Sequence, residues 1–305
     1  MGLLDLFKKK KEFNVLSLFD GISCGQIALN RAGVKYNNYY ASEIEDLAMK
    51  IAMKNYPDTI QLGDITKLKI DGLPKIDLVM GGSPCQGFSF AGKKLNFQDE
   101  RSKLFFEFVR ILEDVKKVNP DVKFLLENVK MDQDSENAIT EIIGVKPVRI
   151  NSSLVSAQNR MRLYWTNIPF TGLPEDKNIV VRDILLDNTK NVFTDERIAN
   201  TKRKCKNYVQ WDLSGKNYNS QQDRAFYLDG KMGTVPKSNP ANKVNIVLDY
   251  ENDVYRRLTA EEVETLQNVP FEYTKIDGVK DHVRIGTLGN GWTVDIIVHI
   301  MKGLL

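Results

Sequence analysis

The sequence contains few of the residues on which several common active sites and folds depend. Its 305 residues include three cysteines, Cys24, Cys85 and Cys205, which stand far apart. This spacing offers neither a disulfide framework nor a zinc-binding pattern, and it fits a reducing compartment. No apolar run approaches the roughly 20 residues that a membrane-spanning helix needs. We therefore expect a cytoplasmic protein that makes no membrane contact.

The shortage of histidine excludes two further kinds of cysteine-dependent enzyme. The only histidines, His282 and His299, come late in the chain and have no obvious orienting partner, so a cysteine–histidine nucleophile of the protease kind is not indicated. Zinc deaminases need a His-x-Glu and a Cys-x-x-Cys pattern, and the sequence has neither. We expect no metal site.

The remaining composition is that of an ordinary globular protein large enough for one main domain and a smaller one. Hydrophobic residues make up 42% of the chain and charged residues 27%, which excludes a disordered or fibrous protein. The formal net charge of +3 is compatible with a nucleic-acid partner but does not require one.

Strand-like and helix-like segments alternate through the first half of the sequence. The apolar patterns predict strands over 15–19, 76–80, 122–126 and 163–166, and helices over 22–32, 46–55 and 104–118. This alternation predicts an α/β fold with a doubly wound, mostly parallel sheet covered by helices on both faces. Near the C-terminus, a capping box from Thr259 to Glu262 predicts another helix, and 292–301 is apolar enough for a buried terminal helix.

The region from about 171 to 251 differs in composition from the first half. It is polar and loop-rich and has few apolar runs. Between 201 and 245 there are nine lysines and arginines against three acids, with aromatic residues among them. Such a mixture is typical of a surface that faces nucleic acid. The alternative is a solvated, loop-rich domain whose charges are simply exposed.

Three features at predicted strand ends point to an adenosine-containing ligand. The turn from Phe19 to Gly25, with Asp20 and Gly21, lies between a strand and a helix, where glycine lets the backbone approach a ligand. Glu43 follows the next strand and is suited to bind ribose hydroxyls. Asp64 comes at a third strand end and is suited to an adenine amino group.

Cys85 and Glu127 are the residues best placed for chemistry. Cys85 follows Pro84 at a predicted strand end and is a candidate nucleophile, although a free cysteine is more commonly a small buried residue. The apolar run before Glu127 predicts its burial, which would raise the pKa of a carboxyl group and allow it to donate a proton. A purely structural acid is the alternative.

Together these motifs resemble those of the DNA cytosine-C5 methyltransferases. The segment 103–108 favours the subgroup, found in bacteria and phages, that resembles the animal de novo enzymes. Three further motifs follow in the order typical of the family: Gln158-Asn159-Arg160-Met161-Arg162, then Arg257-Leu258-Thr259 with Glu262, and then Gly289-Asn290-Gly291-Trp292. The resemblance runs from about residue 15 to residue 301, with only the middle region poorly matched.

The resemblance implies a cofactor, S-adenosyl-L-methionine, and a role for each matching residue. The residues implied around the cofactor are Phe19, Asp20, Gly21, Gly25, Glu43, Ile44, Asp64, Ile65, Pro84, Leu104, Asn290, Gly291 and Trp292. Cys85 would attack C6 of the cytosine, Glu127 would hold the base at N3, and Arg160 and Arg162 would lie near the base. The implied DNA contacts are Gln86, Ser89, Lys202, Arg203, Lys204, Arg224 and Thr234.

The resemblance also implies a division of labour along the chain. Residues 1–169 and 272–305 would form the catalytic domain, and 170–271 would recognise the target in double-stranded DNA. A cognate restriction endonuclease is a possible partner, and no obligate protein partner is implied. Two alternatives stay open: a tRNA cytosine-C5 methyltransferase, against which Ser83 and the segment 87–89 weigh mildly, and an idle DNA-binding relative, which the intact Cys85, Glu127 and Arg162 disfavour.

Overall fold

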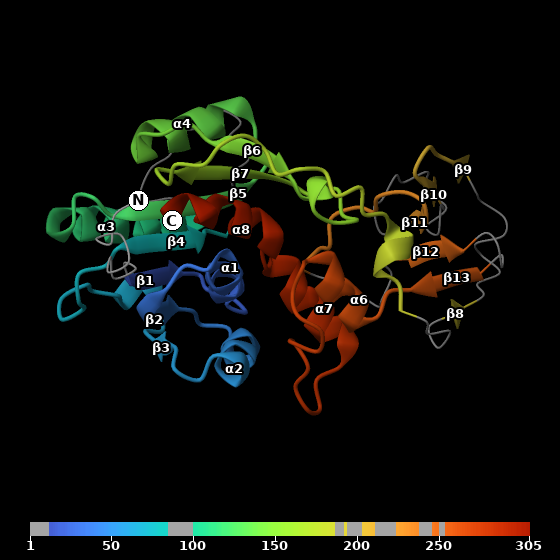
Figure 1. Ribbon diagram of the computed structural model, residues 1–305, viewed down its shortest axis with the longest axis horizontal. Coiled ribbons are helices and arrows are strands. Elements are labelled where there is room, and N and C mark those ends of the chain that lie inside the picture. The colour runs from blue at the N-terminus through green and yellow to red at the C-terminus, as the bar shows by residue number, and fades with distance from the viewer. Residues whose placement is uncertain are drawn as a thin grey trace, which may run out of the picture. The chain divides into compact units, whose positions relative to one another are not determined.

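The structure, a computed structural model, describes residues 12–84, 100–186, 192–193, 203–210, 224–237, 246–249 and 254–305 (Figure 1). The chain divides into two compact units. The first unit comprises Met1–Arg149, Arg162–Thr171 and Val298–Leu305, and the second comprises Ile150–Met161 and Gly172–Ile297. Segments 150–161 and 272–297 thus group with the second unit, whereas the sequence assigned them to the catalytic domain. Which residues serve catalysis and which serve recognition remains a prediction.

A seven-stranded sheet forms the centre of the first unit. Its strands are β1 (Phe13–Leu18), β2 (Tyr36–Ser42), β3 (Ile60–Gln61), β4 (Leu78–Gly82), β5 (Lys123–Val129), β6 (Val148–Asn151) and β7 (Met161–Thr166), in the order β3-β2-β1-β4-β5-β7-β6. The pairs β2–β3, β1–β2, β1–β4 and β4–β5 are parallel, and β7 runs antiparallel to β5. This arrangement confirms the predicted α/β fold with a mostly parallel sheet.

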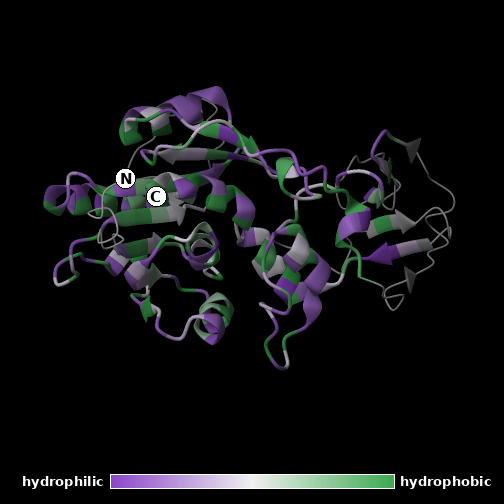
Figure 2. Ribbon diagram, in the orientation of Figure 1, coloured by the Kyte–Doolittle hydropathy of each residue, from purple (hydrophilic) through white to green (hydrophobic). Residues whose placement is uncertain are grey.

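Helices cover both faces of this sheet. They are α1 (Cys24–Ala32), α2 (Asp46–Asn55), α3 (Glu100–Val118) and α4 (Gln133–Ile143). The sequence predicted α2 with its observed bounds, predicted α1 and α3 to within a few residues, and did not predict α4. Figure 2 shows hydrophobic residues along the central strands, whereas α4 alternates between hydrophobic and hydrophilic positions.

Alternate strand positions pack against α3 on one face of the sheet. The buried side chains of this core include Leu16, Leu18, Val79, Phe124 and Leu126 from the strands and Phe105, Phe108, Ile111, Leu112 and Val115 from α3. Burying each such side chain stabilises the fold by about 1.5–3 kcal/mol. On the other face, α1 approaches β4 so closely that a Cβ atom on Gly25 would lie 2.4 Å from the Cε of Met80.

A second sheet of six short strands lies in the second unit. It has the order β8-β13-β12-β11-β10-β9, from β8 (Val192–Phe193), β9 (Arg203–Lys204), β10 (Tyr208–Gln210), β11 (Arg224–Tyr227), β12 (Ile246–Asp249) and β13 (Val254–Arg257). The sequence did not predict these strands. Strands of two to four residues are too short to show an alternating pattern in sequence.

Two C-terminal helices follow the sequence prediction, and a third helix between them was not predicted. Helix α6 (Ala260–Leu266) begins at a capping box in which Thr259 and Glu262 bond to each other's backbone N–H groups, and α7 (Asp281–Asn290) and α8 (Val294–Met301) follow it. Within the described part of the chain, no helix combines the length and the apolar character needed to cross a membrane.

Candidate active site

Four neighbouring strands of the first sheet reach one edge of the sheet in register. The residues that pair in register across β2, β1, β4 and β5 are Ser42, Leu18, Gly81 and Leu126. Glu43, Phe19 and Glu127 come immediately after this row. Because neighbouring strands lie about 4.8 Å apart, Glu43 and Glu127 mark the ends of an edge about 14 Å long.

The strand order reverses direction within this edge, between β1 and β4. Ligands of open α/β sheets bind at such a point, beyond the carboxyl ends of the strands. The two strands approach closely here, since a Cβ atom on Gly81 would lie 2.6 Å from the carbonyl oxygen of Leu18. Only glycine fits at position 81, and the predicted site residues flank this point on both sides.

The turn after β1 has an unusual backbone. Phe19, Gly21 and Ser23 all have positive φ angles, of 57°, 60° and 62°. The left-handed conformation costs on the order of 1–2 kcal/mol for a residue other than glycine. Among the described residues, no atom lies within 4 Å of the place where a Cβ atom on Gly21 would stand. The turn therefore exposes its backbone to open space, as a ligand-binding turn must.

Glu43 joins this turn to the loop that follows β2. One oxygen of its carboxylate accepts the N–H of Gly21 at 2.8 Å, and the other accepts the N–H groups of Ile44 and Glu45 at 2.7 and 2.9 Å. The Ile44 side chain is 68% exposed, which is unusual for so large an apolar residue. Carboxylate oxygens beside an exposed apolar side chain suit the ribose and the flat base of a nucleoside.

Asp64 caps the short helical turn Ile65–Lys67 after β3. Its carboxylate accepts hydrogen bonds from the backbone N–H and the hydroxyl of Thr66, which lower the pKa of Asp64 below its usual range and keep it ionised. The Ile65 side chain is buried in the core, so only its backbone can face a ligand. Arg110 of α3 donates to the carbonyl oxygens of Ile65 and Leu68 and so fixes this turn, a role that the sequence did not reveal.

Pro84 follows the end of β4, and Leu104 lies on α3, the helix that comes next in the chain. Both therefore belong to the β4 side of the point where the strand order reverses. Pro84 is exposed, and Leu104 on α3 is partly buried against the core. The side chain of Asn128 on β5 donates to the carbonyl and hydroxyl oxygens of Ser83, at 3.3 and 3.1 Å. Asn128, another residue missed in the sequence, thereby holds the chain where it leaves β4 and continues to Pro84 and Cys85.

Glu127 forms an ion pair with Arg162. The Nε atom of Arg162 lies 2.9 Å from an oxygen of Glu127, and the side chains are only 13% and 11% exposed. Arg162 on β7 pairs in register with Val129 on β5, two residues after Glu127, so the two charged side chains are diagonal neighbours on one face of the sheet. Because Glu127 also pairs with Gly82 of β4, the ion pair lies close to the start of the Ser83-Pro84 segment.

Arg160 and Arg162, which the sequence places together near the base, have different partners in the structure. Arg160 is buried in the second unit, where its guanidinium group donates to the carbonyl oxygens of Val235, Gly289 and Gly291 at 3.2, 3.1 and 3.0 Å. These contacts give Arg160 a structural role, and its place near the base stays a prediction. It ties the segment at 235 to the end of α7.

The last predicted cofactor residues also lie in the second unit. Asn290 is exposed, Gly291 and Trp292 are partly exposed, and the carbonyl oxygen of Gly291 accepts from both Arg160 and Gln267. Gln267 thus serves as a second anchor of this segment. The contact of these three residues with a cofactor stays a prediction.

Several predicted residues lie outside the described part of the chain or are described only in part. Cys85, Gln86, Ser89 and Lys202 lie outside it, and for Arg203 and Lys204 only the strand β9 is described. Arg224 lies over the ring of Tyr208, 4.5 Å from its centroid. Thr234 donates to the carbonyl oxygen of Asn159.

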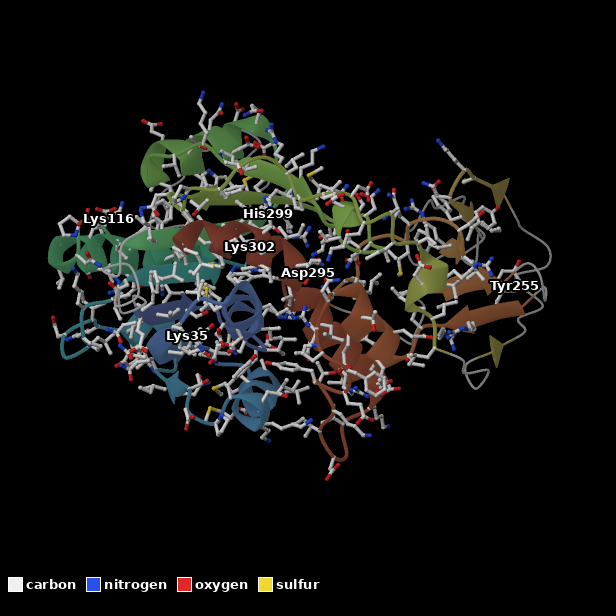
Figure 3. The ribbon with its side chains drawn as sticks, in the orientation of Figure 1. Lys35, Lys116, Tyr255, Asp295, His299 and Lys302 are labelled. Atoms are coloured by element: carbon white, nitrogen blue, oxygen red, sulfur yellow. The ribbon has the colours of Figure 1, made fainter. Side chains whose placement is uncertain are left out.

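Figure 3 labels one of the two histidines, His299, on α8. Its ring packs edge-on against Phe170, with the centroids 5.7 Å apart. It thus makes an aromatic contact of an ordinary structural kind.

The comparison with known protein families shows which family this sequence matches. The family described as C-5 cytosine-specific DNA methylase matches residues 13–305. The chain belongs to this family. It is a DNA cytosine-C5 methyltransferase and uses S-adenosyl-L-methionine as methyl donor. The site fits that cofactor, because the open turn at Gly21, the Glu43 carboxylate and the ionised Asp64 offer contacts to a nucleoside that carries a positive charge.

Among similar bacterial and phage proteins, the chain resembles the type II methyltransferase M.NgoBV of Neisseria gonorrhoeae. The two are 26% identical over 310 residues, which cover 89% of this chain and 71% of the relative. It is 37% identical to the orphan methyltransferase M.SPRI of Bacillus phage SPR over 170 residues, which cover 52% of this chain and 38% of the phage protein.

Solved structures show that the fold is shared beyond these relatives. The Dnmt2 methyltransferase of S. pombe superimposes with a TM-score of 0.72 at 18% identity and covers 95% of this chain and 98% of its own. The methyltransferase EhMeth of Entamoeba histolytica gives a TM-score of 0.73 at 17% identity, with 96% and 98% covered. At such low identity, these likenesses establish the fold alone.

Proposed function

We propose that the methyltransferase acts on a cytosine flipped out of duplex DNA, through a covalent bond between Cys85 and C6 of the base. The observation that carries this proposal is the Glu127–Arg162 ion pair at the edge of the sheet from which Ser83 and Pro84 lead to Cys85. A base inside a stacked duplex is out of reach of all these groups, so the nucleotide has to be extruded, at a cost of a few kcal/mol.

The cofactor would lie at the other end of the same edge. Glu43 would accept hydrogen bonds from the ribose hydroxyls, Asp64 and the backbone of Ile65 would contact the adenine edge, and Ile44 would cover its face. Phe19, Gly21, Pro84 and Leu104 would complete the pocket. When bound, S-adenosyl-L-methionine supplies an electrophilic methyl group on its sulfonium.

The chain's own residues would then make C5 of the cytosine nucleophilic and afterwards restore the aromatic ring of the base. The thiolate of Cys85 adds to C6 and breaks the C5–C6 double bond, while Glu127, oriented by Arg162, passes a proton to N3, where negative charge develops. After C5 has gained the methyl group, the C5 proton leaves to water and the C5–C6 double bond re-forms. The Sγ–C6 bond breaks to restore the thiolate, and N3 returns its proton to Glu127.

The second sheet would belong to the part that recognises the target. Lys202, Arg203, Lys204 and Arg224 would contact phosphates, and Gln86, Ser89 and Thr234 would contact the target nucleotide or its neighbours. The relative M.NgoBV is named a type II methyltransferase, and a cognate restriction endonuclease is the corresponding partner proposed for this chain.

Methylation-sensitive sequencing of DNA from cells that express the chain tests this proposal. We expect 5-methylcytosine at one fixed position of a short recurrent sequence, absent from cells that lack the chain. Methylation confined to tRNA from the same cells, with unmodified DNA, would replace the proposal with the RNA alternative. Unmodified DNA and RNA would favour the idle relative.

A further inference from the structure

A buried network of hydroxyl, carboxyl and amide groups lies beneath the turn after β1, on the face of the sheet that α1 covers. Its centre is the carboxyl group of Asp20. One oxygen accepts the hydroxyl of Tyr39 at 2.6 Å, and the other accepts the hydroxyl of Ser23 at 2.7 Å. Both oxygens of Asp20 are thus held from inside the protein.

The network continues away from the turn. The side-chain amide of Gln26 donates to the hydroxyls of Ser23 and Thr59, at 2.9 and 2.7 Å, and its oxygen accepts the hydroxyl of Tyr36 at 3.0 Å. Tyr39, Ser23 and Gln26 are 2%, 0% and 2% exposed. Groups so deeply buried keep their hydrogen bonds, because water cannot replace a lost partner.

From this geometry we infer that Tyr39 is a positioning residue for the cofactor turn and acts through Asp20. The turn contains two non-glycine residues with left-handed backbone, Phe19 and Ser23, and such strain persists only where the surroundings hold it in place. The backbone N–H of Asp20 donates to the carbonyl oxygen of Ser42, and its carbonyl oxygen accepts the N–H of Ser23. Together with the two side-chain bonds, these contacts fix Asp20 on four sides.

The pKa shifts of Asp20 and Tyr39 agree with a positioning role for Tyr39. Burial raises the pKa of the Asp20 carboxyl, while hydrogen bonds from Ser17, Ser23 and Tyr39 act in the opposite direction. Burial and the neighbouring Asp20 raise the pKa of Tyr39 well above its usual range, so its hydroxyl keeps the proton that it donates. The inference changes the predicted part of Asp20 from a direct contact of its side chain to support of the backbone that contacts the cofactor.

Tyr39→Phe removes a single hydroxyl group and leaves the ring in place. Without that donor one buried oxygen of Asp20 loses a hydrogen bond, and the turn loses part of the support that holds it. We expect the dissociation constant for S-adenosyl-L-methionine, measured by calorimetry without DNA, to rise roughly tenfold, as hydrogen bonds to charged groups imply. At saturating cofactor, kcat and the KM for DNA should stay within about twofold of the parent values on the same reasoning.

Tyr36→Phe is the matched control, because it removes the same group from the same strand at the far end of the network. Its cofactor affinity should equal that of the parent. An equal loss in both variants, or no loss with Tyr39→Phe, would overturn the inference. A double-mutant cycle adds a readout that simple destabilisation would not move, since Tyr39→Phe should have no further effect on cofactor affinity in an Asp20→Ala background.

Thermal unfolding shows whether each variant is folded. Asp20→Asn, which keeps the size of the side chain, serves as a second probe should Tyr39→Phe fail to fold. The affinity of Asp20→Asn for S-adenosyl-L-methionine should also fall, and an unchanged affinity would contradict the inference.

The inference rests on the proposed cofactor site but not on the covalent mechanism. Failure of the parent protein to bind the cofactor would refute the site itself, whereas loss of methyl transfer with intact binding would bear only on catalysis.

Discussion

Cys85→Ala should abolish methyl transfer while leaving cofactor binding unchanged. Removal of a covalent nucleophile commonly lowers kcat by roughly 10⁴-fold or more, because the remaining groups cannot supply the missing bond. The measurement is transfer of a radiolabelled methyl group to DNA, accompanied by calorimetric titration with S-adenosyl-L-methionine. Normal binding of S-adenosyl-L-methionine without methyl transfer would show that the substitution affects the chemical step and not cofactor binding.

The other two cysteines provide the controls. Cys24 is buried at the start of α1 and Cys205 lies between β9 and β10, partly exposed. Cys24→Ala and Cys205→Ala should each retain most of the activity. Substantial turnover by Cys85→Ala would contradict the mechanism, and a complete loss with either control would move the nucleophile elsewhere.

Glu127→Gln should lower kcat by about 10²- to 10⁴-fold, the range usual for loss of a proton-transferring group. The amide keeps the size of the carboxyl group but carries no negative charge for Arg162 and cannot exchange a proton with N3 of the base. Single-turnover methyl transfer at saturating DNA and cofactor measures the chemical step directly. The affinity for S-adenosyl-L-methionine should not change, because Glu127 lies at the far end of the edge from Glu43.

Glu136→Gln is the matched control within the same unit. Glu136 on α4 is also a buried carboxylate paired with an arginine, with its oxygens 2.7 and 2.8 Å from a nitrogen of Arg149. Its substitution should lower the free energy of unfolding by about 1–3 kcal/mol without changing single-turnover rates. Equal rate losses in both variants would mean that Glu127 serves stability and not catalysis.

Much of the first unit follows from local sequence pattern. Strands that feed into glycine turns and helices predict parallel pairing, and parallel pairing brings their carboxyl ends together. For this reason Phe19, Gly21, Glu43, Asp64 and Glu127 could be assigned to one edge before any coordinates were known. The hydrogen bond from Gly21 to Glu43 agrees with that assignment.

The residues that hold this edge in place could not be found in the same way. Tyr39, Arg110 and Asn128 act on partners 19 to 45 positions away in sequence. Local sequence alone can account for two of these residues, because tyrosine favours strands and an arginine three residues after Glu107 forms a common helix ion pair. Their distant hydrogen-bond partners become visible only in the folded structure.

Arg160 and Arg162 illustrate a second limit. They share a motif and are two residues apart, yet one bonds to backbone carbonyl groups in the second unit and the other pairs with Glu127. The spacing of two residues in an extended segment predicts the side of the strand to which each side chain points. It does not predict which residues each side chain contacts. The six short strands of the second sheet were missed for a related reason, because their order depends on pairing between distant segments.

Covalent trapping tests the central claim most directly. A fluorine at C5 of the target cytosine cannot leave as a proton does, so the Cys85–C6 bond should persist after methyl transfer. We predict that duplex DNA with 5-fluorocytosine at the target will form a complex that survives denaturing electrophoresis, and that its formation will require both S-adenosyl-L-methionine and Cys85. No complex under conditions in which a known enzyme of the family is trapped, or preferential trapping of fluorinated tRNA, would contradict the account.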